Sequence, residues 1–74
     1  MKEKDSIILT KLGANVLKMR TRKGFSQDDV ALRCEVDRAK ISKIENGTAN
    51  YNITTFIELA KGLEVDPKDL LNLD

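Results

Sequence analysis

The chain has 74 residues, of which 41% are hydrophobic, 34% charged and 4% aromatic, and its formal net charge is +1. This length and composition are typical of one small domain of short amphipathic helices around an aliphatic core, and they exclude disorder over the whole chain. No apolar run exceeds three residues and mixed charges follow Met1, which excludes a membrane span and a signal peptide. We therefore expect a single domain over residues 1–74, located in the cytoplasm.

The residue types needed for the common catalytic and metal sites are missing. Histidine is absent, Cys34 is the only cysteine, and no glycine-rich phosphate-binding string occurs. The usual zinc and haem ligand sets, Ser-His or Cys-His nucleophile pairs and an intramolecular disulfide are thereby excluded. We expect no metal, no cofactor and no enzymatic activity, and we expect Cys34 to be a small buried hydrophobic residue.

Charge is distributed unevenly along the chain. Residues 11–43 carry nine Lys/Arg against four acids, whereas residues 44–74 carry two against six. Such a dipolar chain can present one face to a negatively charged polymer such as a nucleic acid. The alternative is a mixed, solvated surface without a partner.

The first expected helix runs from Asp5 or Ser6 to Arg22. Its apolar residues recur with the three-and-four spacing of one helical face, at Ile8, Leu9, Leu12, Val16 and Met19. Gly24 ends this helix, because glycine readily adopts the left-handed conformation that closes a helix.

Two short helices are expected next. Ser26 is the N-cap of a helix over about 27–34, in which Val30, Ala31 and Cys34 face inward. Asp37 caps a helix over about 38–46, with Ile41 and Ile44 inward, and Gly47 ends it. Because the connection between these two helices is so short, their axes must cross steeply. Residues 26–46 are therefore predicted to form a helix-turn-helix.

Two further helices complete the chain. A polar loop over 48–52 precedes a helix capped by Thr54, in which Gly62 is a mild weakness and whose core face is Phe56, Leu59, Ala60 and Leu63. Asp66 caps a last helix with Pro67 at its first position, where a missing N–H costs nothing. The predicted fold is all-α, with five helices and no strand.

The sequence resembles the Cro/C1-type helix-turn-helix family of phage repressors and restriction-modification controller proteins. The match spans about Leu12 to Leu71 and includes Gly24, Ser26-Gln27, "ISKIENGT" and "LAKGLEV". The resemblance implies a lambda repressor-like DNA-binding domain that regulates transcription. The string at 52–54 looks more like the controller proteins, and the third helix begins with Arg38 where well-known phage members have glutamine, so their operator does not carry over.

The third helix is the predicted reader, because the major groove of duplex DNA admits one helix. Its outward residues are the candidates for base contact: Arg38, Ala39, Ser42 and Lys43. Arginine and lysine donate to guanine O6 and N7, while alanine can touch a thymine methyl group. Candidates for phosphate contact are Gln27, Lys40, Asn46, Arg22 and Lys23. The alternatives are an exposed helix-start residue for Gln27 and local hydrogen bonding for Asn46.

The resemblance also implies a structural ion pair between Arg20 and Glu45, and a homodimer formed through the fourth and fifth helices. Apolar residues in excess of a small core are incidental exposure or a dimer face: Leu17, Tyr51, Ile57, Leu71 and Leu73. We expect a symmetric dimer on a palindromic operator of double-stranded DNA. The alternative is an antitoxin-type interaction protein that binds DNA together with a protein partner.

Overall fold

A computed structural model describes residues 3–73 of the chain, and this range contains five α-helices and no β-strand. The helices are α1 (Glu3–Lys23), α2 (Gln27–Arg33), α3 (Arg38–Glu45), α4 (Ile53–Leu63) and α5 (Pro67–Leu70). The predicted all-α class is confirmed. Most predicted helix ends differ from the observed ones by one or two residues, and Cys34 and Asn46 follow α2 and α3 as C-caps rather than lying inside them.

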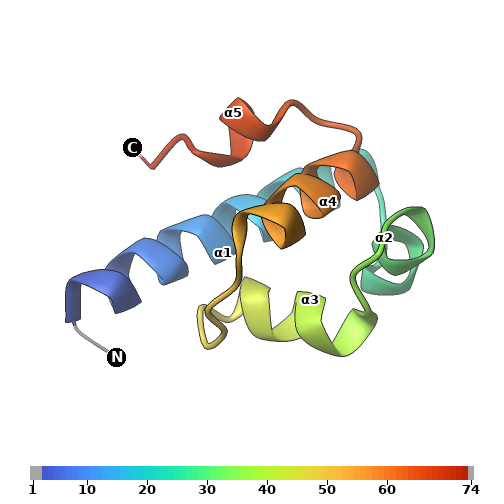
Figure 1. Ribbon diagram of the computed structural model, residues 1–74. Helices are drawn as coiled ribbons and strands as arrows, with labels where there is room; N and C mark the ends of the chain where they lie inside the picture. The colour runs from blue at the N-terminus through green and yellow to red at the C-terminus, as the bar shows by residue number, and fades with distance from the viewer. Residues whose placement is uncertain (1–2, 74) are drawn as a thin grey trace.

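The helices pack around α1 and α4. Figure 1 shows these two helices side by side at the centre, with α3 below them, α2 at one end and α5 above. The connection from Cys34 to Asp37 is short, and α3 leaves α2 in a different direction, as the predicted helix-turn-helix requires. Asn15 of α1 donates from Nδ2 to the carbonyl oxygens of Leu70, at 2.9 Å, and Asn72, at 2.6 Å, which ties the segment after α5 to α1.

The helix starts are fixed by side-chain caps. Ser26, Asp37 and Asp66 cap α2, α3 and α5 as predicted. The predicted cap of α4 is wrong. Asn52, not Thr54, occupies the N-cap, and its Oδ1 accepts from the Thr55 backbone N–H at 2.9 Å. Both residue types cap helices well, but the Thr54 hydroxyl is already engaged as a donor to the same Asn52 oxygen at 2.7 Å.

Three helices end with a residue in the left-handed conformation. Gly24 and Gly47 follow α1 and α3 with φ of +73°, in the hydrogen-bond pattern typical of glycine at a helix end. Glu64 takes the same role after α4, with φ 59° and ψ 41°, although it carries a Cβ. Its carboxylate accepts from Arg33 Nη1 at 2.6 Å.

The core is aliphatic and agrees with the predicted helix faces. The largest fully buried side chains are Val16, Val30, Ile41, Ile44, Leu59, Leu63 and Leu70. The prediction that Ile8 extends the inner face of α1 is wrong, because this side chain is 41% exposed, near the end of α1 that lies farthest from α2 in Figure 1. Cys34 is only partly buried, with its thiol 3.3 Å from the carbonyl oxygen of Val30. No helix within residues 3–73 is both long enough and apolar enough to cross a bilayer.

Two glycines allow helices to approach closely. A Cβ on Gly62 would lie 3.0 Å from the Cys34 sulfur and 3.1 Å from the Val30 carbonyl oxygen. Gly62 therefore has a packing role that the sequence analysis did not assign, since a side chain there would crowd the contact between α4 and α2. A Cβ on Gly13 would overlap the carbonyl oxygen of Ile44 and lie 2.8 Å from that of Glu45. Gly13 thereby sets the distance between α1 and the last turn of α3.

Candidate nucleic-acid interface

The outward side of α3 carries the side chains predicted to contact bases. Ile41 and Ile44 point into the core with no exposed surface. Ala39 and Lys43 are exposed, Ser42 is partly exposed, and the Arg38 side chain is 66% exposed. The four predicted base-contact residues thus all lie on an accessible part of α3.

An open hollow joins the start of α3 to the start of α2. Its volume is about 510 Å³, and its lining residues are Gln27, Asp37, Arg38, Ala39 and Ser42. The structure therefore brings three of the four predicted base-contact residues together with one predicted phosphate-contact residue. Lys43 lies further along α3 and does not line the hollow.

A buried ion pair joins α3 to the end of α1 and to the turn that leads into α2. Arg20 Nε lies 2.6 Å from Glu45 Oε2, and Arg20 Nη2 donates to Glu45 Oε1 at 3.0 Å. A third donor, Arg20 Nη1, reaches the Phe25 carbonyl oxygen at 2.9 Å. The side chains of Arg20 and Glu45 are only 15% and 5% exposed. The hydrogen bond to Glu45 raises the pKa of Arg20, so this guanidinium stays charged.

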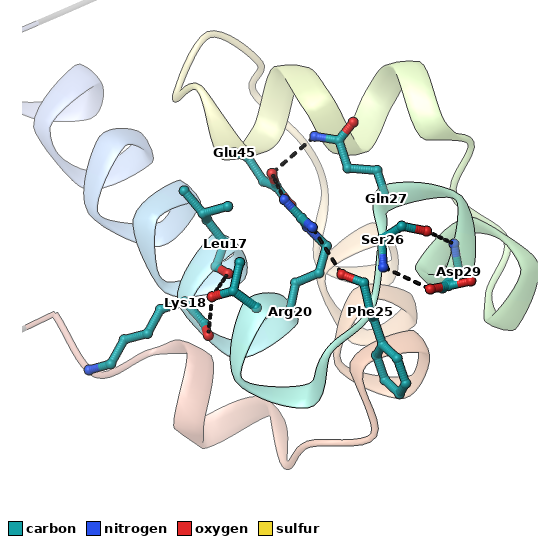
Figure 2. Close-up of polar contacts among 9 residues, drawn as sticks. Leu17, Lys18, Arg20, Phe25, Ser26, Gln27, Asp29 and Glu45 are labelled. Atoms are coloured by element: carbon teal, nitrogen blue, oxygen red, sulfur yellow. Dashed lines mark hydrogen bonds and ion pairs between the residues drawn. The ribbon is translucent and has the colours of Figure 1, made fainter.

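Gln27 joins the same group. Its Nε2 donates to Glu45 Oε1 at 3.0 Å, as Figure 2 shows. We call Arg20, Glu45 and Gln27 the bracing triad. It connects the end of α1, the end of α3 and the start of α2. One N–H of the Gln27 amide is engaged in this bond, which leaves the other N–H and the amide oxygen for further hydrogen bonds.

The start of α2 is fixed by a capping box. The Ser26 backbone N–H donates to Asp29 Oδ2 at 2.8 Å, and the Asp29 N–H donates to Ser26 Oγ at 3.0 Å (Figure 2). Hydrogen bonding to Ser26 lowers the pKa of the Asp29 carboxyl group, with the Ser26 backbone N–H contributing most and the Ser26 side chain second. The capping box holds Gln27 at the first position of α2, beside the hollow.

The remaining predicted phosphate contacts differ in how they are held. Lys40 Nζ donates to the Asn50 carbonyl oxygen at 3.3 Å, and Lys23 Nζ donates to the Glu64 carbonyl oxygen at 3.1 Å. Arg22 and Asn46 are exposed, and the backbone N–H of Asn46 donates to Ser42 at the end of α3. Lys23 thus reaches toward the end of α4, whereas Lys40 stays beside α3.

One acidic residue near the reader was missed by the sequence reasoning. Asp28 Oδ1 lies 3.5 Å from Arg38 Nε. Asp28, in the first turn of α2, was not among the predicted contact residues. The sequence does contain a signal for this contact, because an acid and an arginine stand at the starts of two helices that a short turn joins. Within residues 3–73 no group of His, Cys, Asp or Glu could hold a metal ion.

The candidates for a dimer face lie apart from this interface, on α4 and near α5. Ile57 and Leu71 are 46% and 56% exposed, and Ile53, which the sequence reasoning missed, is 68% exposed. Leu73 and Tyr51 are partly buried. An apolar hollow of about 270 Å³ adjoins them, lined by Leu9, Leu12, Asn50, Tyr51, Asn52, Ile53, Phe56 and Leu71. Burial raises the pKa of Tyr51, whose enclosed hydroxyl has no hydrogen-bond partner within the described residues.

Comparison with known proteins places the chain in a family. A protein-family model described as "Helix-turn-helix domain" matches residues 13–74 of this chain. The control protein C.BamHI of Bacillus amyloliquefaciens is 39% identical over 61 residues, covering 81% of this chain and 75% of that protein. The restriction-modification controller protein C.AhdI of Aeromonas hydrophila has a similar structure, with a TM-score of 0.83 and 31% identity over 88% of this chain and 94% of its own.

A second controller protein, C.Esp1396I, has been solved as a tetramer in complex with its natural 35 base-pair operator. Its TM-score is 0.76 and its identity 33%, over 88% of this chain and 96% of that protein. The predicted resemblance to controller proteins is thus confirmed. The chain belongs to the helix-turn-helix domain family, within the Cro/C1-type group that includes the restriction-modification controller proteins.

Proposed function

We propose that this chain is a sequence-specific regulator of transcription that binds duplex DNA with α3 in the major groove. The observation that carries the proposal is the exposed side of α3, which presents hydrogen-bonding side chains on a helix braced by the buried Arg20–Glu45 pair. A reader helix needs this combination, because base contacts specify a sequence only when the scaffold fixes their register. Binding and release of DNA then suffice for function, without a catalytic step.

Each outward residue of α3 has a distinct role in this proposal. Arg38 and Lys43 donate to guanine O6 and N7, and Ala39 contacts a thymine methyl group. Ser42 donates to or accepts from a base edge within the hollow. Arg38 carries most of the specificity, since arginine alone among these side chains can bind guanine through two parallel hydrogen bonds.

Phosphate contacts set the position of α3 on the duplex. Gln27 donates its second amide N–H to a phosphate, while Arg22, Lys23, Lys40 and Asn46 supply further contacts. Lys40 loses only a long hydrogen bond of 3.3 Å when it turns from the Asn50 carbonyl oxygen to DNA. Each neutralised phosphate adds to the salt dependence of binding.

A homodimer completes the proposed reader. The exposed apolar residues Ile53, Ile57 and Leu71, with Leu73 and Tyr51 at their edge, form the contact between two copies. A symmetric pair of reader helices binds two half-sites about one helical turn, or a multiple of it, apart. The operator complex of C.Esp1396I supports assembly on DNA by a protein of this fold. The concentration of the chain then regulates occupancy through mass action.

The test is selection of bound duplexes from a random DNA pool at two salt concentrations. We expect enrichment of a palindrome and an affinity that falls steeply with salt. Arg38→Ala and Lys43→Ala should each relax the preference at one position of the half-site, by about 1–3 kcal/mol per lost guanine contact. Lys68→Ala on α5 removes the same charge outside the interface and is the matched control.

Two results would contradict the proposal. If the double variant Arg38→Ala, Lys43→Ala kept the wild-type sequence preference, α3 would not be the reader. If folded wild-type protein enriched no sequence and bound only weakly, specificity would need a second protein, and the antitoxin-type function would replace this one.

A further inference from the structure

Among the ion pairs of residues 3–73, the most exposed joins the start of α2 to the start of α3. Arg38 Nε and Asp28 Oδ1 are 3.5 Å apart, and the two side chains are 66% and 73% exposed. A pair this open to water contributes little to folding stability, because solvent screens the attraction and two side chains must be ordered. Arg38 lines the hollow and Asp28 lies next to the lining residue Gln27, so the pair matters more for what Arg38 does than for the fold.

The acidic neighbours of Arg38 differ in whether they are already engaged. Asp37 also lines the hollow, but its carboxylate caps α3 by accepting from the Lys40 backbone N–H at 2.8 Å. Asp29 is held in the capping box with Ser26. Asp28 has neither role, and its recorded partner within residues 3–73 is Arg38. The start of α2 thus supplies one carboxylate that can act on the reading arginine.

The ion pair lies on the Nε side of the guanidinium, at a separation of 3.5 Å that forms no hydrogen bond. An arginine presents five N–H donors in a planar fork, one on Nε and two on each Nη. When a carboxylate takes the Nε side, both terminal Nη groups stay available on the far edge of the same plane. The two terminal groups match the spacing of O6 and N7 on guanine.

We propose that Asp28 is a positioning residue for DNA reading, which holds the Arg38 guanidinium so that its two terminal nitrogens meet one guanine. The proposal rests on the function proposed above and names a residue that sets its specificity. Long arginine side chains lose conformational freedom on binding. The ion pair to Asp28 orients the Arg38 guanidinium before DNA binds, which reduces the conformational freedom lost on binding. This orientation favours guanine, because guanine accepts hydrogen bonds from both terminal nitrogens. Asp28 also repels phosphates, which disfavours a competing contact between Arg38 and the DNA backbone.

The experiment measures the DNA affinity of wild type, Asp28→Asn, Asp28→Glu and Arg38→Ala. The first duplex carries the sequence selected by wild type. The other three duplexes replace one base pair, at the position where Arg38→Ala loses its preference, with each of the alternatives. Wild type should prefer guanine there by roughly 5- to 150-fold, the range of one good bidentate contact. Asp28→Asn should lower this preference by roughly 2- to 12-fold, the effect of ordering one long side chain. Asp28→Glu keeps the charge and should retain most of the preference.

Two controls separate positioning from simple charge removal. In the Arg38→Ala background, Asp28→Asn should no longer change the preference at that position. Asp69→Asn on α5 makes the same charge change away from the hollow and should leave the preference unaltered. Thermal melts of all variants confirm that the domain is folded.

The outcomes distinguish this inference from the function on which it rests. If Asp28→Asn tightened binding equally to all duplexes and kept the wild-type guanine preference, Asp28 would act by repulsion alone and the inference would be refuted while the function stood. If wild type selected no sequence, the proposed function would fail, and the inference would fail with it.

Discussion

Replacing Gly13 with alanine tests how closely α1 packs on the reader helix. Helix propensity alone predicts a gain of about 1 kcal/mol, because alanine is the best helix former and glycine one of the worst. The structure predicts the opposite sign. The new Cβ would overlap the Ile44 carbonyl oxygen and lie 2.8 Å from that of Glu45. Both atoms belong to the backbone, so no side chain can rotate away.

The size of the stability change depends on how far α1 and α3 must separate to accommodate the new Cβ. Relief requires α1 and the last turn of α3 to separate by about 1 Å, a gap that forfeits a quarter to a half of each contact across it. Ile44 is fully buried there and the Glu45 side chain is 5% exposed. Overpacking costs about 1–3 kcal/mol, and a backbone clash lies at the upper end. After the propensity gain we expect a net loss of about 2 kcal/mol, a large part of the roughly 4–11 kcal/mol that a domain of this size has.

Urea denaturation followed by circular dichroism measures this change. The matched control is Ala14→Gly, at the next and exposed position of α1, where only propensity acts and the loss should be about 1 kcal/mol. Both substitutions should therefore destabilise, for opposite reasons. If Gly13→Ala instead raised the midpoint at unchanged slope, the close approach of α1 and α3 would be incorrect.

Arg20→Ala leaves the Glu45 carboxylate buried without its cation, so the free energy of unfolding in denaturant should fall by about 3–5 kcal/mol. A fall of less than about 1 kcal/mol would show that water solvates that carboxylate. Glu64→Gly removes about 1–2 kcal/mol of left-handed strain and an exposed ion pair worth at most about 1 kcal/mol, so the melting temperature should rise, whereas a fall would contradict the strain. Asp29 has a lowered pKa when folded, so its stabilising effect is present above pH ~4 and is lost as the carboxylate protonates at lower pH. The difference in melting temperature between wild type and Asp29→Asn should therefore shrink on acidification, and a constant difference would contradict the assignment.

Much of the fold follows from local sequence patterns. The apolar spacing of Val16, Ile41, Ile44 and Leu59 predicts the buried faces, and the caps at Ser26, Asp37 and Asp66 are visible because capping needs only neighbouring residues. What the sequence does not reveal depends on partners far away in the chain. Gly13 and Gly62 acquire their roles only from backbone atoms of other helices, and Glu64 has no composition signal for a left-handed helix end.

In the candidate site, too, some features follow from local sequence patterns and others depend on tertiary packing. The outward residues of α3 follow from helical periodicity once Ile41 and Ile44 are assigned inward. The contact between Asp28 and Arg38 depends on the crossing of α2 and α3, which periodicity does not supply. Likewise the place of Gln27 beside Glu45 requires the packed end of α3. Sequence patterns thus indicate which side chains face outward, and only tertiary structure shows which of them act together.

The bracing triad makes the position of α3 dependent on a distant part of the chain. Arg20 and Glu45 are 25 residues apart, and Gln27 is 18 residues from Glu45. The end of α1 therefore supplies one of the contacts that fix α2 and α3 relative to each other, beside their shared core and the direct bond between Gln27 and Glu45. A cleavage or a local opening that released α1 would remove the Arg20 cation and leave the Glu45 carboxylate beside Gln27 without its counter-charge.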